Sequence, residues 1–331
     1  SDLRKATIRE RNTGPNAVCV SNADTSDRRG HDNLPHQPTF TFLTRDQPAC
    51  AMVLVTLSAI SGAAIFLLFR IFDKRNIPIL PVITLNYFVA FLFGALYSQP
   101  WLAGDLSKLW LPSAGVGTLF IGVFYLTALS TQRAGVAAST VASKLSLVIT
   151  VLFTVLIYNE RPTILAWIGI VCALVAVPLS AMGKGAEARN WKLPLLLFFG
   201  TASIDISLNA VQRMHLTPAT EGVFPTMCFI WAGGIALLFI WRNKMFAAFK
   251  DPKVWIGGIV LGVINFFALL FILQALAHSG LPASTVFPLL SIGVILLGTI
   301  GSYLIFRDRP SRPQFIGIAV AVIALALLVT K

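Results

Sequence analysis

The amino-acid sequence predicts an all-α integral membrane protein, with ten transmembrane helices arranged as two inverted five-helix repeats. Its 331 residues are 56% hydrophobic and only 12% charged, with a mean hydropathy of +0.77, whereas about a quarter of a soluble domain is charged. The apolar runs are continuous and about twenty residues long, which is the length of a membrane-spanning helix. A β-barrel would instead alternate apolar and polar residues over segments of about ten.

A passage from the middle of the chain recurs near its end. The segment from Ala134 reads AGVAASTV and the segment from Ser279 reads SGLPASTV. Each continues through an apolar run, a turn (NERP or RDRP) and an apolar helix that contains Gly169 or Gly317. A duplicated block in such an apolar chain is typical of a secondary transporter built from two halves. Because each half holds five spans, an odd number, the second half is expected to enter the membrane inverted, with a pseudo-two-fold axis in the membrane plane.

The chain is expected to divide into a polar tail, residues 1–51, a first repeat, residues 52–182, and a second repeat, residues 183–331. The tail is rich in Asn, Asp, Thr, Pro and Arg and lacks the apolar core of a signal peptide, so we expect it to be disordered. Met52 stands directly before the first apolar run. We therefore expect Met52 to be the natural start, and the tail to be upstream translated sequence or a cloning remnant.

In the first half, the apolar runs predict spans at residues 53–72, 79–98, 110–130, 136–158 and 163–182. The third span begins at Trp110, where an aromatic side chain would anchor in the membrane interface. The fourth carries the AASTV block. The turn Glu160–Arg161–Pro162 ends the fourth span and begins the fifth, because proline is tolerated in a first helical turn. We expect this turn to be a structural hinge.

In the second half, spans are predicted at residues 192–212, 222–241, 255–277, 283–306 and 314–330. The polar segment GKGAEARN, residues 183–190, is the joint between the halves. Trp191, Trp241 and Trp255 fall at span ends and are expected to lie in the interface. The ninth span begins with the second ASTV block, and Asp308–Arg309–Pro310 is the hinge before the tenth.

The charge of +12 lies in short loops, where it serves as an orientation signal and does not indicate nucleic-acid binding. Loops after the odd-numbered spans hold fourteen basic residues: Arg70, Lys74, Arg75, Arg133, Lys184, Arg189, Lys192, Arg242, Lys244, Lys250, Lys253, Arg307, Arg309 and Arg312. Loops after the even-numbered spans, together with the C-terminus, hold four: Lys108, Arg161, Arg213 and Lys331. The positive-inside rule places the odd loops in the cytoplasm and both termini on the extracytoplasmic side.

Two charged residues are predicted to lie inside the membrane. Lys144 and Asp205 fall roughly 12 Å and 18 Å from the cytoplasmic ends of their spans, so their depths are similar. An unpaired charge there costs about 2.5–3.5 kcal/mol, so each should face a partner or a wet cavity. Three interpretations stay open: an ion pair that holds two spans together, a substrate site in which Lys144 binds an anionic group and Asp205 accepts a proton or a substrate ammonium, or a cavity lining without an essential role. Lys144 corresponds to Leu289 in the second copy, so the shared scaffold does not require it.

Four further residues are candidate substrate contacts. Asn86, Asn209 and Asn265 lie at depth, where the alternative is an interhelical hydrogen bond worth about 0.6 kcal/mol. Pro288 follows the second ASTV block, where a bent helix would open a cavity and free backbone carbonyls for a ligand. No metal-binding motif, no cofactor motif and no nucleophile with an intramembrane histidine is present, so an enzyme is not expected.

Together, the AASTV and PASTV blocks, the NERP and RDRP turns and the Gly169 and Gly317 helices resemble the drug/metabolite transporter superfamily, in particular its EamA-type bacterial branch. The resemblance covers the chain from Met52 onward. It implies a central cavity between the halves, alternating access, and export or uptake of small metabolites, amino acids or amphipathic compounds. We expect an exporter in the bacterial inner membrane, a monomer or homodimer, and proton exchange at Asp205 could drive its cycle. Alternatives are an organic-phosphate or nucleotide-sugar carrier or, further off, a non-transporting receptor or an enzyme. Many relatives have cytoplasmic termini, whereas the loop charges here predict external ones.

Overall fold

The fold is described from a computed structural model, which describes residues 48–158, 163–182, 190–215, 220, 222–278 and 283–329. All regular structure in these ranges is helical. The α-helices are α1 (Pro48–Lys74), α2 (Ile79–Ser98), α3 (Ser107–Ala134), α4 (Val136–Leu145), α5 (Leu147–Tyr158), α6 (Ile164–Ala181), α7 (Lys192–His215), α8 (Val223–Arg242), α9 (Pro252–His278), α10 (Ala283–Phe306) and α11 (Arg312–Val329). Two short 3₁₀ helices, η1 (Pro100–Leu102) and η3 (Met245–Lys250), lie in connections.

Nine helices in the described ranges are long and apolar enough to cross a membrane, with α4 and the start of α5 counted as one. The tenth predicted span, α11, is a shorter apolar helix. The prediction of an all-helical, multi-pass membrane protein is therefore confirmed. The expectations for the tail up to residue 47, the hinge at residues 160–162 and most of the joint between the halves lie outside the described residues.

Two helix boundaries differ from the predicted ones. Helix α1 begins at Pro48, so the last residues assigned to the tail are helical. The fourth span, predicted as continuous, is interrupted at Ser146, between α4 and α5. The hydroxyl of Ser146 lies 2.7 Å from the carbonyl oxygen of Ser143, and serine side chains compete in this way with the helix ladder. Helix α10 is continuous through Pro288.

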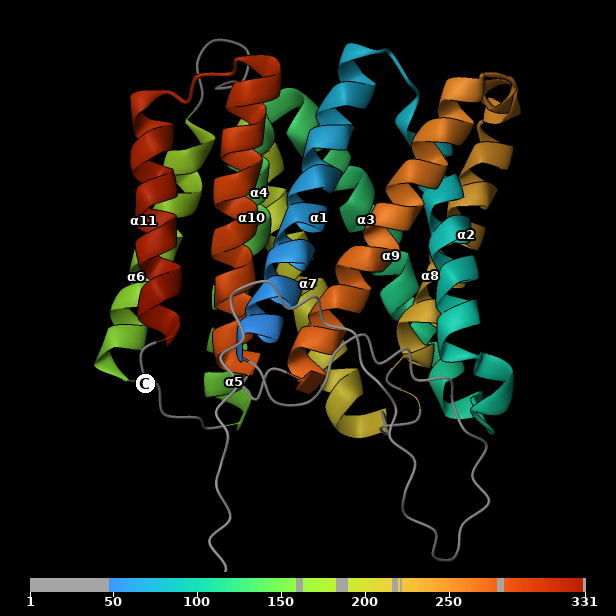
Figure 1. The fold of residues 1–331 in the computed structure, drawn as a ribbon, viewed down its shortest axis with the longest axis horizontal. Coiled ribbons are helices and arrows are strands. Elements are labelled where there is room, and N and C mark those ends of the chain that lie inside the picture. Colours follow the sequence, from blue (N-terminus) through green and yellow to red (C-terminus); the bar gives the residue numbers. More distant parts are fainter. Residues whose placement is uncertain are drawn as a thin grey trace, which may run out of the picture.

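The helices stand side by side, with α6 and α11 at one edge of the bundle and α2 and α8 at the other (Figure 1). Helix α1 begins, and α11 ends, at the same end of the bundle (Figure 1). Near the middle, α1 packs against α9 and α10, while α3 packs against α7 and α8, and α4 lies between α7 and α10.

Basic residues of the described ranges gather at one end of the bundle, where α1 ends and α2 begins. We call this the basic end; it carries Arg70, Lys74, Arg75, Arg133, Lys192, Arg242, Lys244, Lys250, Lys253, Arg307, Arg309 and Arg312. The opposite end, where α1 begins, carries Lys108 and Arg213 within the described ranges. At the opposite end the exposed Asp105 accepts hydrogen bonds from the amide and hydroxyl of Ser107 at the start of α3, and these bonds lower its pKa.

Glycines allow the closest helix contacts. A Cβ added at Gly169 in α6 would lie 2.9 Å from the carbonyl oxygen of Ala324 in α11, and one added at Gly317 in α11 would lie 2.5 Å from the amide nitrogen of Ser180 in α6. The two glycines of the repeated block thus each face the backbone of the other's helix. Gly258 and Gly262 of α9 make a similar contact with α2. Such close approach increases van der Waals packing, which holds helices together where lipid supplies no hydrophobic drive.

We expect Gly317→Ala to destabilise the bundle, because the added methyl group would meet the backbone at Ser180. Overpacking of this kind costs about 1–3 kcal/mol, and thermal unfolding of the detergent-solubilised protein measures it. Gly234→Ala is the matched control, since a Cβ there has nothing within 4 Å. Equal unfolding temperatures for the two variants would contradict the packing.

Candidate functional site

A cavity of about 480 Å³ lies in the middle of the bundle. Its walls come from α1, α2, α3, α4, α7, α8, α9 and α10, so segments far apart in the sequence enclose it. The lining is mostly aliphatic and aromatic, and seven of its side chains are aromatic: Phe66, Tyr87, Phe120, Phe124, Phe224, Phe229 and Phe287. A cavity of this size and apolar character is suited to a small organic molecule.

The cavity lies closer to the opposite end than to the basic end. On α8 and α10 its lining includes Phe224 and Phe287, the second and fifth residues of helices that begin at the opposite end. On α1 and α3 the last lining residues are Phe66 and Thr127, and about 10–12 Å of further helix separates them from the basic end. The basic end is therefore the closed side.

Lys144 lines the cavity from the last turn of α4. It forms no hydrogen bond or ion pair with any residue in the described ranges. Asp205 of α7 interacts with it electrostatically, but the two do not form an ion pair. The carboxylate of Asp205 instead accepts a hydrogen bond from Ser146, 3.1 Å away, at the break between α4 and α5. The structure therefore brings the two predicted charges into one region without joining them.

Of the other four predicted site residues, one lines the cavity and three do not. Asn265 lines the cavity from α9. Asn86 is fully buried away from the lining, where its amide donates to the carbonyl oxygen of Leu261 (3.2 Å) and links α2 to α9. Asn209 has a buried side-chain oxygen without a partner among the described residues, but does not line the cavity. Pro288 is buried behind the lining, although Phe287 beside it contributes to the wall.

Two lining residues were not among the predicted contacts. The hydroxyl of Thr201 in α7 is buried without a partner within the described ranges and lines the cavity. It lies one helical turn before Asp205, and this spacing is the sequence signal that could have identified it. Tyr87 also lines the cavity, but its hydroxyl is occupied, since it donates to the carbonyl oxygen of Phe120 at 2.9 Å. Among the described residues, no group of three metal-ligating side chains is placed to hold a metal ion.

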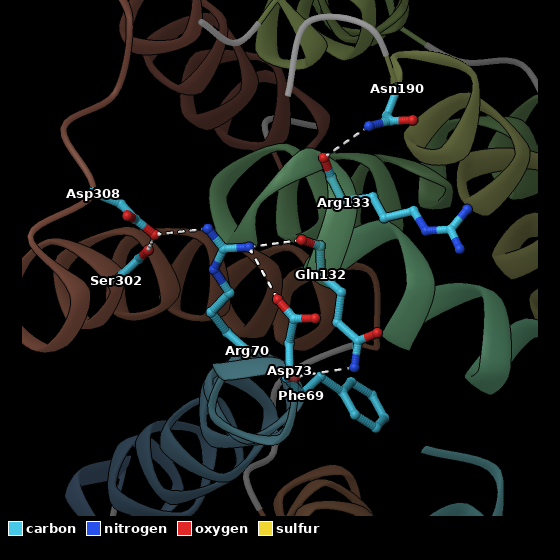
Figure 2. A network of polar contacts seen from close by, with 8 residues as sticks. All are labelled: Phe69, Arg70, Asp73, Gln132, Arg133, Asn190, Ser302 and Asp308. Carbon is cyan, nitrogen blue, oxygen red and sulfur yellow. Dashed lines mark hydrogen bonds and ion pairs between the residues drawn. The ribbon is translucent and has the colours of Figure 1, made fainter. Parts of the chain in front are cut away.

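A polar network closes the basic end (Figure 2). Arg70 of α1, with a side chain only 14% exposed, lies 3.6 Å from the carboxylate of Asp308 and 3.7 Å from that of Asp73. It also donates to the carbonyl oxygen of Gln132 in α3 at 2.6 Å. Ser302 of α10 donates to Asp308. We call these five residues the Arg70 clasp; it joins α1 to the end of α3 and to the connection between α10 and α11.

Close packing lies beneath the clasp. The ring of Phe69 is fully buried and meets that of Phe124 edge-on, with centroids 5.1 Å apart. The buried hydroxyls of Ser130 and Ser139 lie 2.7 Å apart and link α3 to α4. These contacts and the clasp lie between the cavity and the basic end.

A bundle of apolar helices around a central cavity that is closed at one end is typical of a polytopic membrane transporter. Comparison with known proteins agrees with this class. Residues 49–182 match the EamA-like transporter family. An uncharacterized protein of Haemophilus influenzae is 31% identical over 283 residues, which are 81% of this chain and 94% of that protein. The chain belongs to the EamA-like transporter family, as its resemblance to the drug/metabolite transporter superfamily predicted.

More distant relatives share part of the chain. Proteins named "Probable glucose uptake protein GlcU" from Bacillus cereus and Bacillus anthracis are each 27% identical over 192 residues, which are 55% of this chain and 64% of the relative. A solved crystal structure with 17% identity shares the fold, with a TM-score of 0.57 over 84% of this chain and 96% of its own.

We expect Arg70→Ala to loosen the basic end, because it removes the side chain shared by three partners of the clasp. The measurement is the rate of maleimide labelling of Ser130→Cys, in a background whose four native cysteines are replaced by alanine. Labelling should be severalfold faster with Arg70→Ala than without it. Arg75→Ala, an exposed arginine at the same end, is the control and should leave the rate unchanged. Equal rates in both variants would show that the clasp does not seal the cavity.

Proposed function

We propose that this protein is a secondary transporter that moves a small organic substrate across the bacterial inner membrane by alternating access. The observation that carries the proposal is a central cavity lined by helices of both halves and sealed at one end. Lys144, Asp205, Asn265 and Thr201 are the proposed polar contacts. Asn209 and Pro288 are proposed to support these contacts from behind the cavity wall, and Asn86 is proposed to link two helices.

The proposed architecture is ten spans in two inverted halves, residues 52–182 and 183–331, with α11 as the tenth span. The pattern of helix contacts supports it. In an exchange of the halves, each helix of the first half takes the place of its counterpart in the second: α1 of α7, α2 of α8, α3 of α9, α4 of α10 and α6 of α11. The α2–α9 contact then corresponds to the α8–α3 contact, α1–α9 to α7–α3, and α1–α10 to α7–α4. All six of these contacts are present. The α6–α11, α2–α8 and α4–α10 contacts convert into themselves. A two-fold axis between the halves accounts for this pattern.

This symmetry supports alternating access. Helix α4 packs against α10 near the basic end, while α5, its continuation, packs against α7. In the alternate state the two halves would exchange conformations, and the open and closed ends of the cavity would exchange as well. Helix α10 would then separate from α4 at the basic end and close the opposite end. The Arg70 clasp would then open. The described conformation corresponds to the state that is open away from the basic end.

Orientation follows from the charges. The positive-inside rule supports a cytoplasmic basic end and extracytoplasmic termini. We propose export as the direction of transport, on the resemblance to metabolite exporters. Uptake is the second candidate, because two bacterial relatives are named for glucose uptake. An organic-phosphate or nucleotide-sugar carrier ranks lower, since Lys144 is the one cationic side chain among the described residues of the lining.

The purified protein in proteoliposomes should exchange at least one member of a radiolabelled panel of glucose, amino acids and monocarboxylates. Empty liposomes are the control. Exchange of any member faster than in empty liposomes supports a transporter, and whole cells that accumulate or lose that compound then show the direction. If no member crosses faster than in empty liposomes, the proposed function is wrong.

We expect the double variant Thr140→Cys with Gly298→Cys to lock the transporter. A Cβ at Gly298 would lie 3.8 Å from the Cβ of Thr140, which is the usual separation across a disulfide. Oxidation should abolish exchange, and dithiothreitol should restore it. Each single cysteine variant is a control and should exchange at the same rate with and without oxidant. Full exchange by the cross-linked protein would contradict an opening between α4 and α10.

Proton coupling is proposed from the carboxylate of Asp205 beside the cavity. If Asp205 exchanges protons during the cycle, an imposed pH gradient should change the rate of transport in proteoliposomes, and Asp205→Asn should abolish this dependence. Ser203→Ala is the control, because Ser203 lies on the exposed side of the same helix. Transport by the unaltered protein that ignores the gradient would refute the coupling.

A further inference from the structure

We propose that the substrate is a small monoanion with an aromatic or apolar body, whose anionic group is held by Lys144 and Thr201. This inference rests on the proposed transport function and names its substrate class. It differs from the glucose for which two bacterial relatives are named.

The charge of the cavity selects for an anion. Lys144 is the one charged side chain among the described lining residues, and within the described ranges its ammonium forms no hydrogen bond or ion pair, although Asp205 interacts with it at longer range. An ammonium within apolar surroundings is unfavourable unless it is paired. An anionic group in the cavity supplies that pair, and a charge-assisted hydrogen bond to an oxyanion is about twice as strong as a neutral one.

The surroundings of Lys144 limit the ligand to a single negative charge. The carboxylate of Asp205 lies nearby, and its hydrogen bond from Ser146 fixes it at the break beside the end of α4. A second negative charge on the ligand would meet this carboxylate without a further cation in the described lining. A carboxylate therefore fits better than a phosphate dianion.

Free hydroxyl groups lie on the same side as the charge. Because Ser146 contacts Asp205, the turn of α7 from Thr201 to Asp205 lies beside the end of α4. Thr201 lines the cavity, and its buried hydroxyl has no partner within the described ranges. Ser143 lines the cavity next to Lys144. These groups can donate to the second oxygen of a carboxylate.

The rest of the wall suits an apolar body and offers little to a sugar. Two of its hydroxyls are already engaged with backbone carbonyls, Ser58 with Ala268 (2.9 Å) and Thr127 with Val123 (2.8 Å). The hydroxyl of Tyr87 is engaged as well. A sugar whose hydroxyl groups lay against this part of the wall would leave them without partners, which is costly. Aromatic rings instead favour contact with an aromatic or aliphatic group.

The test measures binding to the purified full chain by calorimetry, with phenylacetate, indole-3-acetate and octanoate as monoanions. The neutral isostere phenylacetamide, phenyl phosphate and glucose are the comparisons. We expect saturable binding of at least one monocarboxylate, and binding at least tenfold weaker for phenylacetamide and phenyl phosphate. Lys144→Met should weaken monocarboxylate binding about tenfold to a hundredfold, the loss of one charge-assisted hydrogen bond. Lys144→Arg should retain part of the affinity, and Lys192→Met, at the exposed start of α7, should retain all of it.

The outcomes separate this inference from the transport function. If Lys144→Met does not fold, the comparison of phenylacetate with phenylacetamide on the unaltered protein decides the question. Glucose binding that Lys144→Met leaves unchanged, or no saturable binding of any monocarboxylate, would overturn the monoanion site. Proteoliposome exchange of glucose would then still support a transporter. Monocarboxylate binding without any exchange in proteoliposomes would support the site and contradict the transport function.

Discussion

Hydrocarbon surrounds this chain and offers no hydrogen-bond partners, so each span must satisfy its backbone groups within its own helix. The same solvent removes the usual hydrophobic reason for helices to associate. Close van der Waals contact then has to hold the bundle together. The contacts that glycine permits at Gly169, Gly317, Gly258 and Gly262 meet this requirement, because a side chain at any of them would collide with a neighbouring helix.

The cavity is a consequence of where this close packing stops. Glycines join helix pairs at the edges of the bundle, such as α6 with α11 and α2 with α9, and also nearer its middle, such as α1 with α10 and α4 with α10. The cavity, in contrast, is lined mainly by large aliphatic and aromatic side chains. The one interruption in a described span, at Ser146, faces Asp205 and not lipid. Irregular backbone at membrane depth is tolerated where protein or a wet cavity covers it. The break therefore lies where the polar groups of the candidate site gather.

Much of this architecture could be predicted from the sequence, and the exceptions have identifiable causes. The span positions follow from hydropathy, and similar depth brought Lys144 and Asp205 into one region. Hydropathy could not tell that Asn265 lines the cavity whereas Asn86 links two helices. The side of a helix that faces a cavity depends on neighbouring helices that hydropathy does not identify. The role of Arg70 was hidden among the charges that orient the loops. The break at Ser146 was missed because a serine in an apolar run is a weak signal.

The proposed halves differ most where they should correspond. Lys144 in α4 takes the place of Leu289 in α10, and the interruption at Ser146 has no counterpart in the described part of α10. A ligand shifts the balance between two states only by the difference in its affinity for them. Because Lys144 lies on the helix whose contact with α10 would open in the alternate state, its surroundings would change as the protein switches. Because the charge lies in one half alone, an anionic ligand would have different affinities for the two states. Two identical halves could not provide this difference.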